Sequence, residues 1–204
     1  MSDEPSMNEN SRLHVFGRFF FKIRSFTPIP FILLLIYFSR PTFMSVAIGA
    51  TLLCLGEGLR LWAVGYAGGG TRSRALSAAS HLVTTGPYGR LRNPLYLGNL
   101  LLSLGTCVLA NVYWMVVVLL VGYVVQYAPI IASEETYLRK TCGALYLAYC
   151  SVVPRFLPRL RPYAMASAHR FSLGRALKSE RRTLTAIACV LLLIAVRQGL
   201  GVRF

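Results

Sequence analysis

Five long apolar runs constrain what this chain can fold into more than any other feature. They lie at about residues 25–39, 42–66, 94–110, 112–132 and 183–202. A membrane-spanning helix needs about 20 mostly apolar residues, and runs of this kind are too long for the core of a small soluble domain. The sequence therefore predicts an all-α integral membrane bundle of about five transmembrane helices.

The rest of the sequence leaves room for only one domain. Residues 1–24 are predicted to be a cytoplasmic N-terminal segment, and residues 25–204 a single transmembrane domain. Charged residues make up 14% of the chain, whereas they make up about 25% of an ordinary soluble domain. No signal peptide is expected, because no long apolar run with a small-residue cleavage site precedes residue 25.

Lys and Arg gather on one side of the predicted membrane. They precede the first run, fill the link between the second and third, and follow the fourth, whereas the opposite side carries only Arg40 and Arg203. The positive-inside rule then predicts a cytoplasmic N-terminus and an external C-terminus, in the inner membrane of a bacterium or archaeon. The net charge of +15 fits anionic lipid headgroups, so membrane lipids are expected partners and nucleic acid is not.

The chain contains few groups that could carry chemistry. It has seven Asp and Glu residues, and its five cysteines form no CxxC pair, so we interpret the cysteines as packing residues and expect no metal site. No HExxH, GxSxG, P-loop or GxGxxG motif is present. Metal-dependent hydrolysis, serine acyl transfer and a soluble dinucleotide-binding domain therefore lack their parts.

Polar residues cluster where two apolar runs meet the cytoplasm. Arg92 and Asn93 precede the run at 94–110, while Glu134 and Glu135 follow the run at 112–132. Because almost no chain joins these runs, we expect an antiparallel hairpin that brings the four side chains close together. We also expect Ser133 to cap a separate helix that ends before Pro154. An arginine and carboxylates in such a pocket can bind a carboxylate and hydroxyl groups.

These segments also resemble a known family. Residues 82–88 read Leu-Val-Thr-Thr-Gly-Pro-Tyr, residues 92–98 read Arg-Asn-Pro-Leu-Tyr-Leu-Gly, and Glu134-Glu135 is followed by Gly143, Tyr146 and Tyr149 before Pro154. As a set, and over about residues 59–158, they closely resemble the isoprenylcysteine carboxyl methyltransferase and phospholipid methyltransferase superfamily. The resemblance implies an all-helical membrane enzyme that uses S-adenosylmethionine in a pocket at the cytoplasmic helix ends.

The resemblance also implies site residues, in motifs that span residues 81–98 and 133–154. Arg92 and Glu135 are the predicted catalytic residues. Many family members have His where this chain has Asn93, and Asn cannot take up a proton at neutral pH. The predicted cofactor-binding residues are His81, Leu82, Val83, Gly86, Tyr88, Arg92, Asn93, Pro94, Tyr96, Glu134 and Glu135.

Two further positions are candidates for contact with the substrate. Glu57 lies three residues before Arg60 in an apolar run, so it is either a buried ion-pair partner that fixes helix packing or a substrate-pocket acid. Gly98, with Gly105 on the same run, either leaves a groove for a lipid tail or allows close helix packing.

The predicted reaction is methyl transfer to a lipophilic, lipid-like acceptor. The acceptor is either an isoprenylcysteine-type carboxylate or a phospholipid headgroup, and the small number of bases slightly favours a carboxylate, which needs no deprotonation. One alternative is an NADPH-dependent membrane reductase of the sterol-reductase type, which shares an Arg-x-Pro-x-Tyr string. Another is a non-catalytic membrane module.

Overall fold

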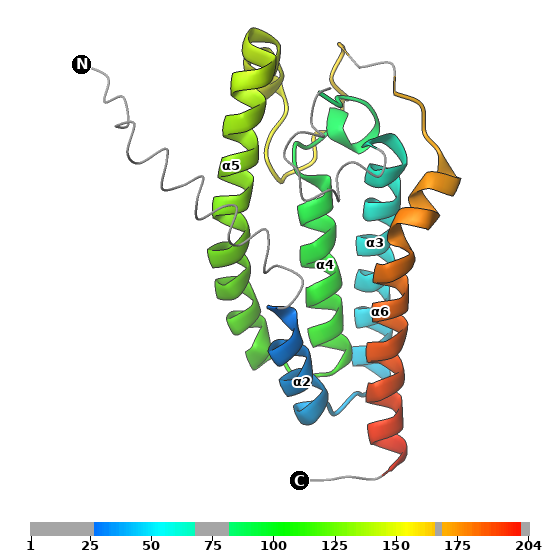
Figure 1. Cartoon of the computed structure of the whole chain (residues 1–204). Helices are drawn as coiled ribbons and strands as arrows, with labels where there is room; N and C mark the ends of the chain where they lie inside the picture. Colours follow the sequence, from blue (N-terminus) through cyan, green and yellow to red (C-terminus); the bar gives the residue numbers. More distant parts are fainter. Residues whose placement is uncertain (1–26, 68–81, 166–168, 201–204) are drawn as a thin grey trace, which may run out of the picture.

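The computed structural model describes residues 27–67, 82–165 and 169–200, and in this part of the chain it contains only helices and loops. The all-α prediction is therefore confirmed. Five α-helices and a short 3-10 helix follow one another along the chain (Figure 1). They are α2 (Pro28–Phe38), α3 (Phe43–Ala67), η3 (Gly86–Gly89), α4 (Pro94–Leu109), α5 (Trp114–Val152) and α6 (Leu173–Gly199).

Three of these helices are long and apolar enough to cross a membrane: α3 with 25 residues, α5 with 39 and α6 with 27. The apolar helices α2 and α4 have 11 and 16 residues. At 1.5 Å per residue α4 is about 24 Å long, whereas the hydrocarbon core is about 30 Å thick. The protein is thus an integral membrane protein. Its described residues form five apolar helices, of which α2 and α4 are shorter than full spans.

Glycines bring α3 and α4 into backbone contact along most of their length. A Cβ atom on Gly105 of α4 would lie 2.9 Å from the carbonyl oxygen of Gly49, and one on Gly98 would lie 3.0 Å from that of Gly56. Small residues at such positions allow membrane helices to approach closely. Of the two interpretations of Gly98 and Gly105, the structure therefore supports close helix packing, since α3 fills the space that a groove would need.

Side chains tie the helix ends together at the end of the bundle opposite η3. Asn111 forms the predicted tight turn between α4 and α5 with a φ of 60°, and its Nδ2 donates to the carbonyl oxygen of Arg40 at 3.0 Å. Arg197 and Gln198, near the end of α6, both donate to the carbonyl oxygen of Ser39, which follows α2. Cations stabilise helix C-termini, so Arg197 anchors the C-terminal end of α2. This role explains the charge that interrupts the apolar run of α6.

The helix α6 begins at Leu173 rather than at the predicted Thr183. Ser172 caps it by accepting a hydrogen bond from the amide of Arg175 at 3.5 Å. Charged residues occupy these early turns, and for that reason hydropathy alone placed the start too late. The consequence for the site is that Glu180 lies on a helix packed against α3, not in a loop.

The helix α5 differs from the prediction at Ser133. We expected a separate helix capped there, but α5 continues through Ser133, which is buried. The break comes instead at Gly143, whose φ of +52° favours glycine. Glu135 and Arg155 would be about 30 Å apart along a straight helix, yet their side chains are in contact. The chain therefore turns back at Gly143 and returns to the start of α4.

Candidate active site

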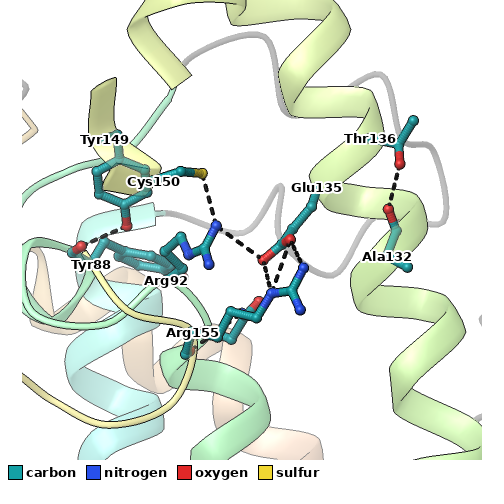
Figure 2. Close-up of polar contacts among 9 residues, drawn as sticks. Tyr88, Arg92, Ala132, Glu135, Thr136, Tyr149, Cys150 and Arg155 are labelled. Atoms are coloured by element: carbon teal, nitrogen blue, oxygen red, sulfur yellow. Dashed lines mark hydrogen bonds and ion pairs between the residues drawn. The ribbon is translucent and has the colours of Figure 1, made fainter. Parts of the chain in front are cut away.

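The two predicted motifs meet at the start of α4. The guanidinium Nη1 of Arg92, just before α4, lies 3.5 Å from Oε1 of Glu135 on α5 (Figure 2). Both side chains are largely buried. The expected proximity of these two groups is confirmed, and it follows from the α4–α5 hairpin.

Arg155 is the main partner of Glu135, and the sequence analysis missed it. Its Nη2 lies 2.6 Å from Oε2 of Glu135, and its Nε donates to both carboxylate oxygens at 3.1 and 3.2 Å. This hydrogen bonding and the negative charge of Glu135 raise the pKa of Arg155. Two guanidinium groups therefore hold the Glu135 carboxylate, which fixes its orientation.

The segment after α5 also satisfies the backbone at the start of α4. The amide of Arg92 donates to the carbonyl oxygen of Pro154 at 2.8 Å, and the amide of Asn93 donates to that of Arg155 at 3.2 Å. Both amides precede Pro94, the first residue of α4, so the helix offers them no acceptor, and an external carbonyl oxygen satisfies them. The side-chain Nδ2 of Asn93 donates to the same Arg155 oxygen at 3.3 Å. In this structure Asn93 therefore holds the returning chain.

The Arg92 guanidinium has one nitrogen with a hydrogen-bond partner and one without a partner among the described residues. Its Nη1 donates to Sγ of Cys150 at 2.8 Å, so Cys150 makes a polar contact that the packing interpretation of the cysteines missed. Its Nε is buried and has no hydrogen-bond partner among the described residues. A buried donor without a partner is costly, and an incoming carboxylate would satisfy it.

Glu134 has different neighbours from Glu135. The hydroxyl of Tyr96 donates to Oε1 of Glu134 at 2.8 Å, and Tyr96 itself is buried on α4. Burial, and after it the charge of Glu134, raise the pKa of Tyr88 well above its usual value. Arg92 and Arg155 both form ion pairs with Glu135.

The other predicted cofactor residues have clear structural roles. Leu82 packs against the buried cluster of Tyr146, Tyr149 and Val153. Gly86 has a φ of +60°, and a Cβ atom there would lie 2.3 Å from the ring of Tyr66, so the fold itself requires glycine. Val83 is partly buried, and Pro94 is the buried first residue of α4. His81 lies outside the described residues.

A second polar cluster lies inside the bundle and joins side chains of α3, α4 and α6. Arg60 of α3 pairs with Glu180 of α6 at 2.6 Å and lies 3.6 Å from Glu57. Arg60 also donates to the side chains of Asn99 and Thr183. The structure thus supplies the ion-pair partner that one interpretation of Glu57 required, and it adds Glu180, which the sequence analysis missed.

Gly98 makes room for this cluster. A Cβ atom on Gly98 would lie 2.5 Å from Cγ of Arg60, so the absence of a side chain lets Arg60 cross α4 and reach Asn99. Gly98 is therefore a packing residue in this structure. No group of three or more His, Cys, Asp or Glu side chains in the described residues is placed to hold a metal ion.

The fold and the site define a class of protein: a helical membrane bundle with an arginine–glutamate cluster where its helices end. Comparison with known families narrows this class. The sequence model of the phospholipid methyltransferase family matches residues 44–144, about half of the chain, and the match includes α3, η3, α4 and both glutamates of α5. The chain belongs to this family, within the superfamily that its motifs resemble.

Two curated relatives carry names of a different kind. The chain is 31% identical over 116 residues, 57% of its length, to a cobalt-zinc-cadmium resistance protein of Cupriavidus metallidurans. It is 28% identical over 127 residues, 62% of its length, to a nickel-cobalt-cadmium resistance protein of Alcaligenes xylosoxydans xylosoxydans. The matches span 49% and 54% of those relatives, about half their length. No solved structure matches the chain.

Proposed function

We propose that the protein is a methyltransferase that uses S-adenosylmethionine and acts on a lipid-like acceptor in the membrane. The observation that carries this proposal is the contact between the two motifs, with Arg92 at the mouth of α4 held by Glu135 of α5. The family match supports a membrane methyltransferase. The cofactor and the acceptor are the parts that we add.

The side chains fit the chemical groups of S-adenosylmethionine. The unfilled donor of Arg92 suits the carboxylate of the methionine portion, and Glu134 suits a hydroxyl or ammonium donor. When bound, this cofactor supplies a methyl group on a positively charged sulfur. The rings of Tyr88 and Tyr96 offer faces that attract such a charge.

The two glutamates would then have separate roles. Glu135 is held by Arg92 and Arg155, so it orients Arg92 and is poorly placed to accept a proton. Glu134, oriented by Tyr96, is the carboxylate that can accept the proton of an amine acceptor. A carboxylate acceptor would need no such step, so an isoprenylcysteine-type carboxylate and a phospholipid headgroup both remain candidate acceptors.

Binding measurements test the cofactor directly. Calorimetry in detergent should show binding of S-adenosylhomocysteine and none of NADPH. Binding of NADPH alone would support the reductase alternative, and binding of neither would support a non-catalytic membrane module. Radiolabelled methyl transfer should then favour a long-chain acceptor over a short water-soluble analogue with the same headgroup.

We also propose that the site faces the cytoplasm of a bacterial or archaeal cell, with the N-terminus on the same side. The support is the charge asymmetry of the sequence. Single cysteines at positions 74 and 111 of a Cys-free variant, labelled from outside intact cells, test this orientation. Position 111 should react and position 74 should not; the reverse pattern would overturn it.

The names of the relatives suggest a physiological setting. We propose that the methylated product contributes to tolerance of divalent metals such as cadmium or cobalt, because both relatives are named for resistance to these metals. A strain that lacks the gene should grow poorly on cadmium, and the wild-type gene should restore growth. Restoration by the Arg92→Ala variant as well would separate metal tolerance from methyl transfer.

A further inference from the structure

The segment that follows α5 exposes apolar side chains in a way that water would not favour. We call residues 155–165 the strap. Leu160 is 95% exposed and Leu157 is 80% exposed, and Phe156 and Met165 are exposed as well. Loops in water are normally polar, and neighbouring exposed apolar side chains on a loop indicate contact with a membrane or a partner.

The exposed leucines alternate with positive charges. Arg159 and Arg161 flank Leu160, Arg155 begins the strap, and the strap contains no Asp or Glu. A segment that combines exposed apolar side chains with Lys or Arg alone matches the headgroup layer of a membrane that contains anionic lipids. A soluble protein partner would require no such one-sided charge.

Backbone hydrogen bonds fix the strap at the depth of the helix ends. The amide of Arg159 donates to the carbonyl oxygen of Arg90 at 3.1 Å, and the amide of Tyr163 donates to that of Gly89 at 2.9 Å. The strap is thus tied to η3 and to the residue that follows it, next to the start of α4.

The position of Trp62 indicates that the strap lies at the depth of the membrane–water interface. The guanidinium of Arg90 lies over the ring of Trp62 on α3, 5.6 Å from the ring centre, and Trp62 is partly exposed. Tryptophan and arginine side chains gather where the hydrocarbon core meets the headgroups. Since Arg90 also accepts from the strap, the strap lies beside this interface.

We propose that the strap is an interfacial anchor that inserts Leu157 and Leu160 into the headgroup layer and binds anionic phospholipid through Arg161. This surface is separate from the proposed active site and does not require methyl transfer. The strap also carries Arg155, the partner of Glu135. A leaflet rich in anionic lipid would therefore hold in place the same segment that orients the site.

Fluorescence in lipid nanodiscs tests the insertion. Trp62 and Trp114 are replaced by Phe, and one tryptophan is introduced by Leu160→Trp. A Lys140→Trp variant is the control, because Lys140 is exposed on α5 between Glu135 and Gly143. Tryptophan at 160 should emit at shorter wavelength, respond to lipids that carry a quencher near the headgroup, and show several-fold weaker quenching by iodide than tryptophan at 140.

Equal quenching by iodide at the two positions would overturn the proposal and leave the strap as a water-facing surface, open to a soluble partner. Leu157→Trp serves as a second probe if Leu160→Trp does not fold. The charge is tested by exchanging phosphatidylcholine for a mixture with phosphatidylglycerol. This exchange should strengthen the lipid quenching at 160, and Arg161→Gln should remove the increase. An increase that survives Arg161→Gln, or no increase at all, would overturn the role of Arg161.

Discussion

The protein holds two arginine–glutamate clusters that differ in what surrounds them. In the interior cluster, Arg60 and Glu180 come from α3 and α6, and their side chains are 9% and 0% exposed. In the end cluster, Glu135 is buried, but Arg155 is 57% exposed. A buried Nε without a hydrogen-bond partner among the described residues occurs in both clusters, on Arg92 and on Arg60. The interior cluster joins helices and is almost closed to solvent, whereas the end cluster has one side exposed to solvent. Similar residue pairs thus serve packing in one place and binding in the other.

The glycine contact between α3 and α4 strengthens this distinction. It brings the two backbones together around the interior cluster, at Gly98 and Gly56. The end cluster is instead assembled by a returning chain, whose backbone carbonyls bond to the amides before α4. Stability should therefore respond most to changes in the interior, and cofactor binding to changes at the helix ends.

The largest effect is expected from Glu180→Gln. Removal of one partner from a buried ion pair leaves Arg60 poorly compensated, and such changes cost about 3–5 kcal/mol of the free energy of unfolding. Thermal unfolding in detergent measures the loss, with Lys178→Gln on the exposed face of α6 as control. The comparison would fail if Glu180→Gln weakened binding of S-adenosylhomocysteine while stability stayed the same.

The next largest effect concerns alanine substitutions at two glycines, which should change the free energy of unfolding in opposite directions. Gly105→Ala places a methyl group 2.9 Å from the backbone of α3 and should destabilise the protein by about 1–3 kcal/mol, as overpacking does. Gly122→Ala has no atom within 4 Å of the new methyl group and should stabilise α5 by up to about 1 kcal/mol. Unfolding curves of the two variants measure both changes in the free energy of unfolding. Equal changes would refute the glycine contact between α3 and α4.

The sequence predicted the parts of the site that depend on neighbouring helices. Arg92 and Glu135 flank a hairpin that the short link at Asn111 enforces, so their contact could be foreseen. Arg155 could not be foreseen in the same way, because its position depends on a reversal at Gly143 within what looks like a continuous helical pattern. Local sequence does not show where a chain returns to after such a reversal.

The interior cluster was harder to predict. Glu180 lies among Lys178, Arg181 and Arg182, and this charge concealed the first turns of α6. Its burial depends on Arg60, which reaches it from another helix. Gly98 was ambiguous for a different reason: a small residue fits an open groove and a close helix contact equally well, and only the position of the neighbouring helix decides between them.

At the helix ends, Arg92→Ala should weaken binding of S-adenosylhomocysteine by about 2 kcal/mol, or roughly 30-fold, with little change in stability. The cause is the loss of the donor that we assign to the cofactor carboxylate. Calorimetry measures the affinity, and Arg139→Ala is the control, since Arg139 is an exposed arginine on α5. Wild-type affinity in a folded Arg92→Ala protein would remove this residue from the site.

The smallest effect is expected from Arg155→Ala, about 1 kcal/mol or fivefold in cofactor affinity. The side chain of Arg155 is more than half exposed, so water partly replaces it, and it acts on the cofactor only through Glu135. The effects of substitutions at Arg155 and Glu135 on cofactor affinity should therefore not be additive. In a Glu135→Gln background, Arg155→Ala should have almost no further effect on affinity, whereas Arg139→Ala should have none in either background. Arg155→Lys should recover only part of the loss, because an ammonium group cannot replace the hydrogen bonds that Nε and Nη2 make together. A full fivefold loss of affinity in the Glu135→Gln background would show that Arg155 binds the cofactor itself. Both arginines of the end cluster would then contact the cofactor directly.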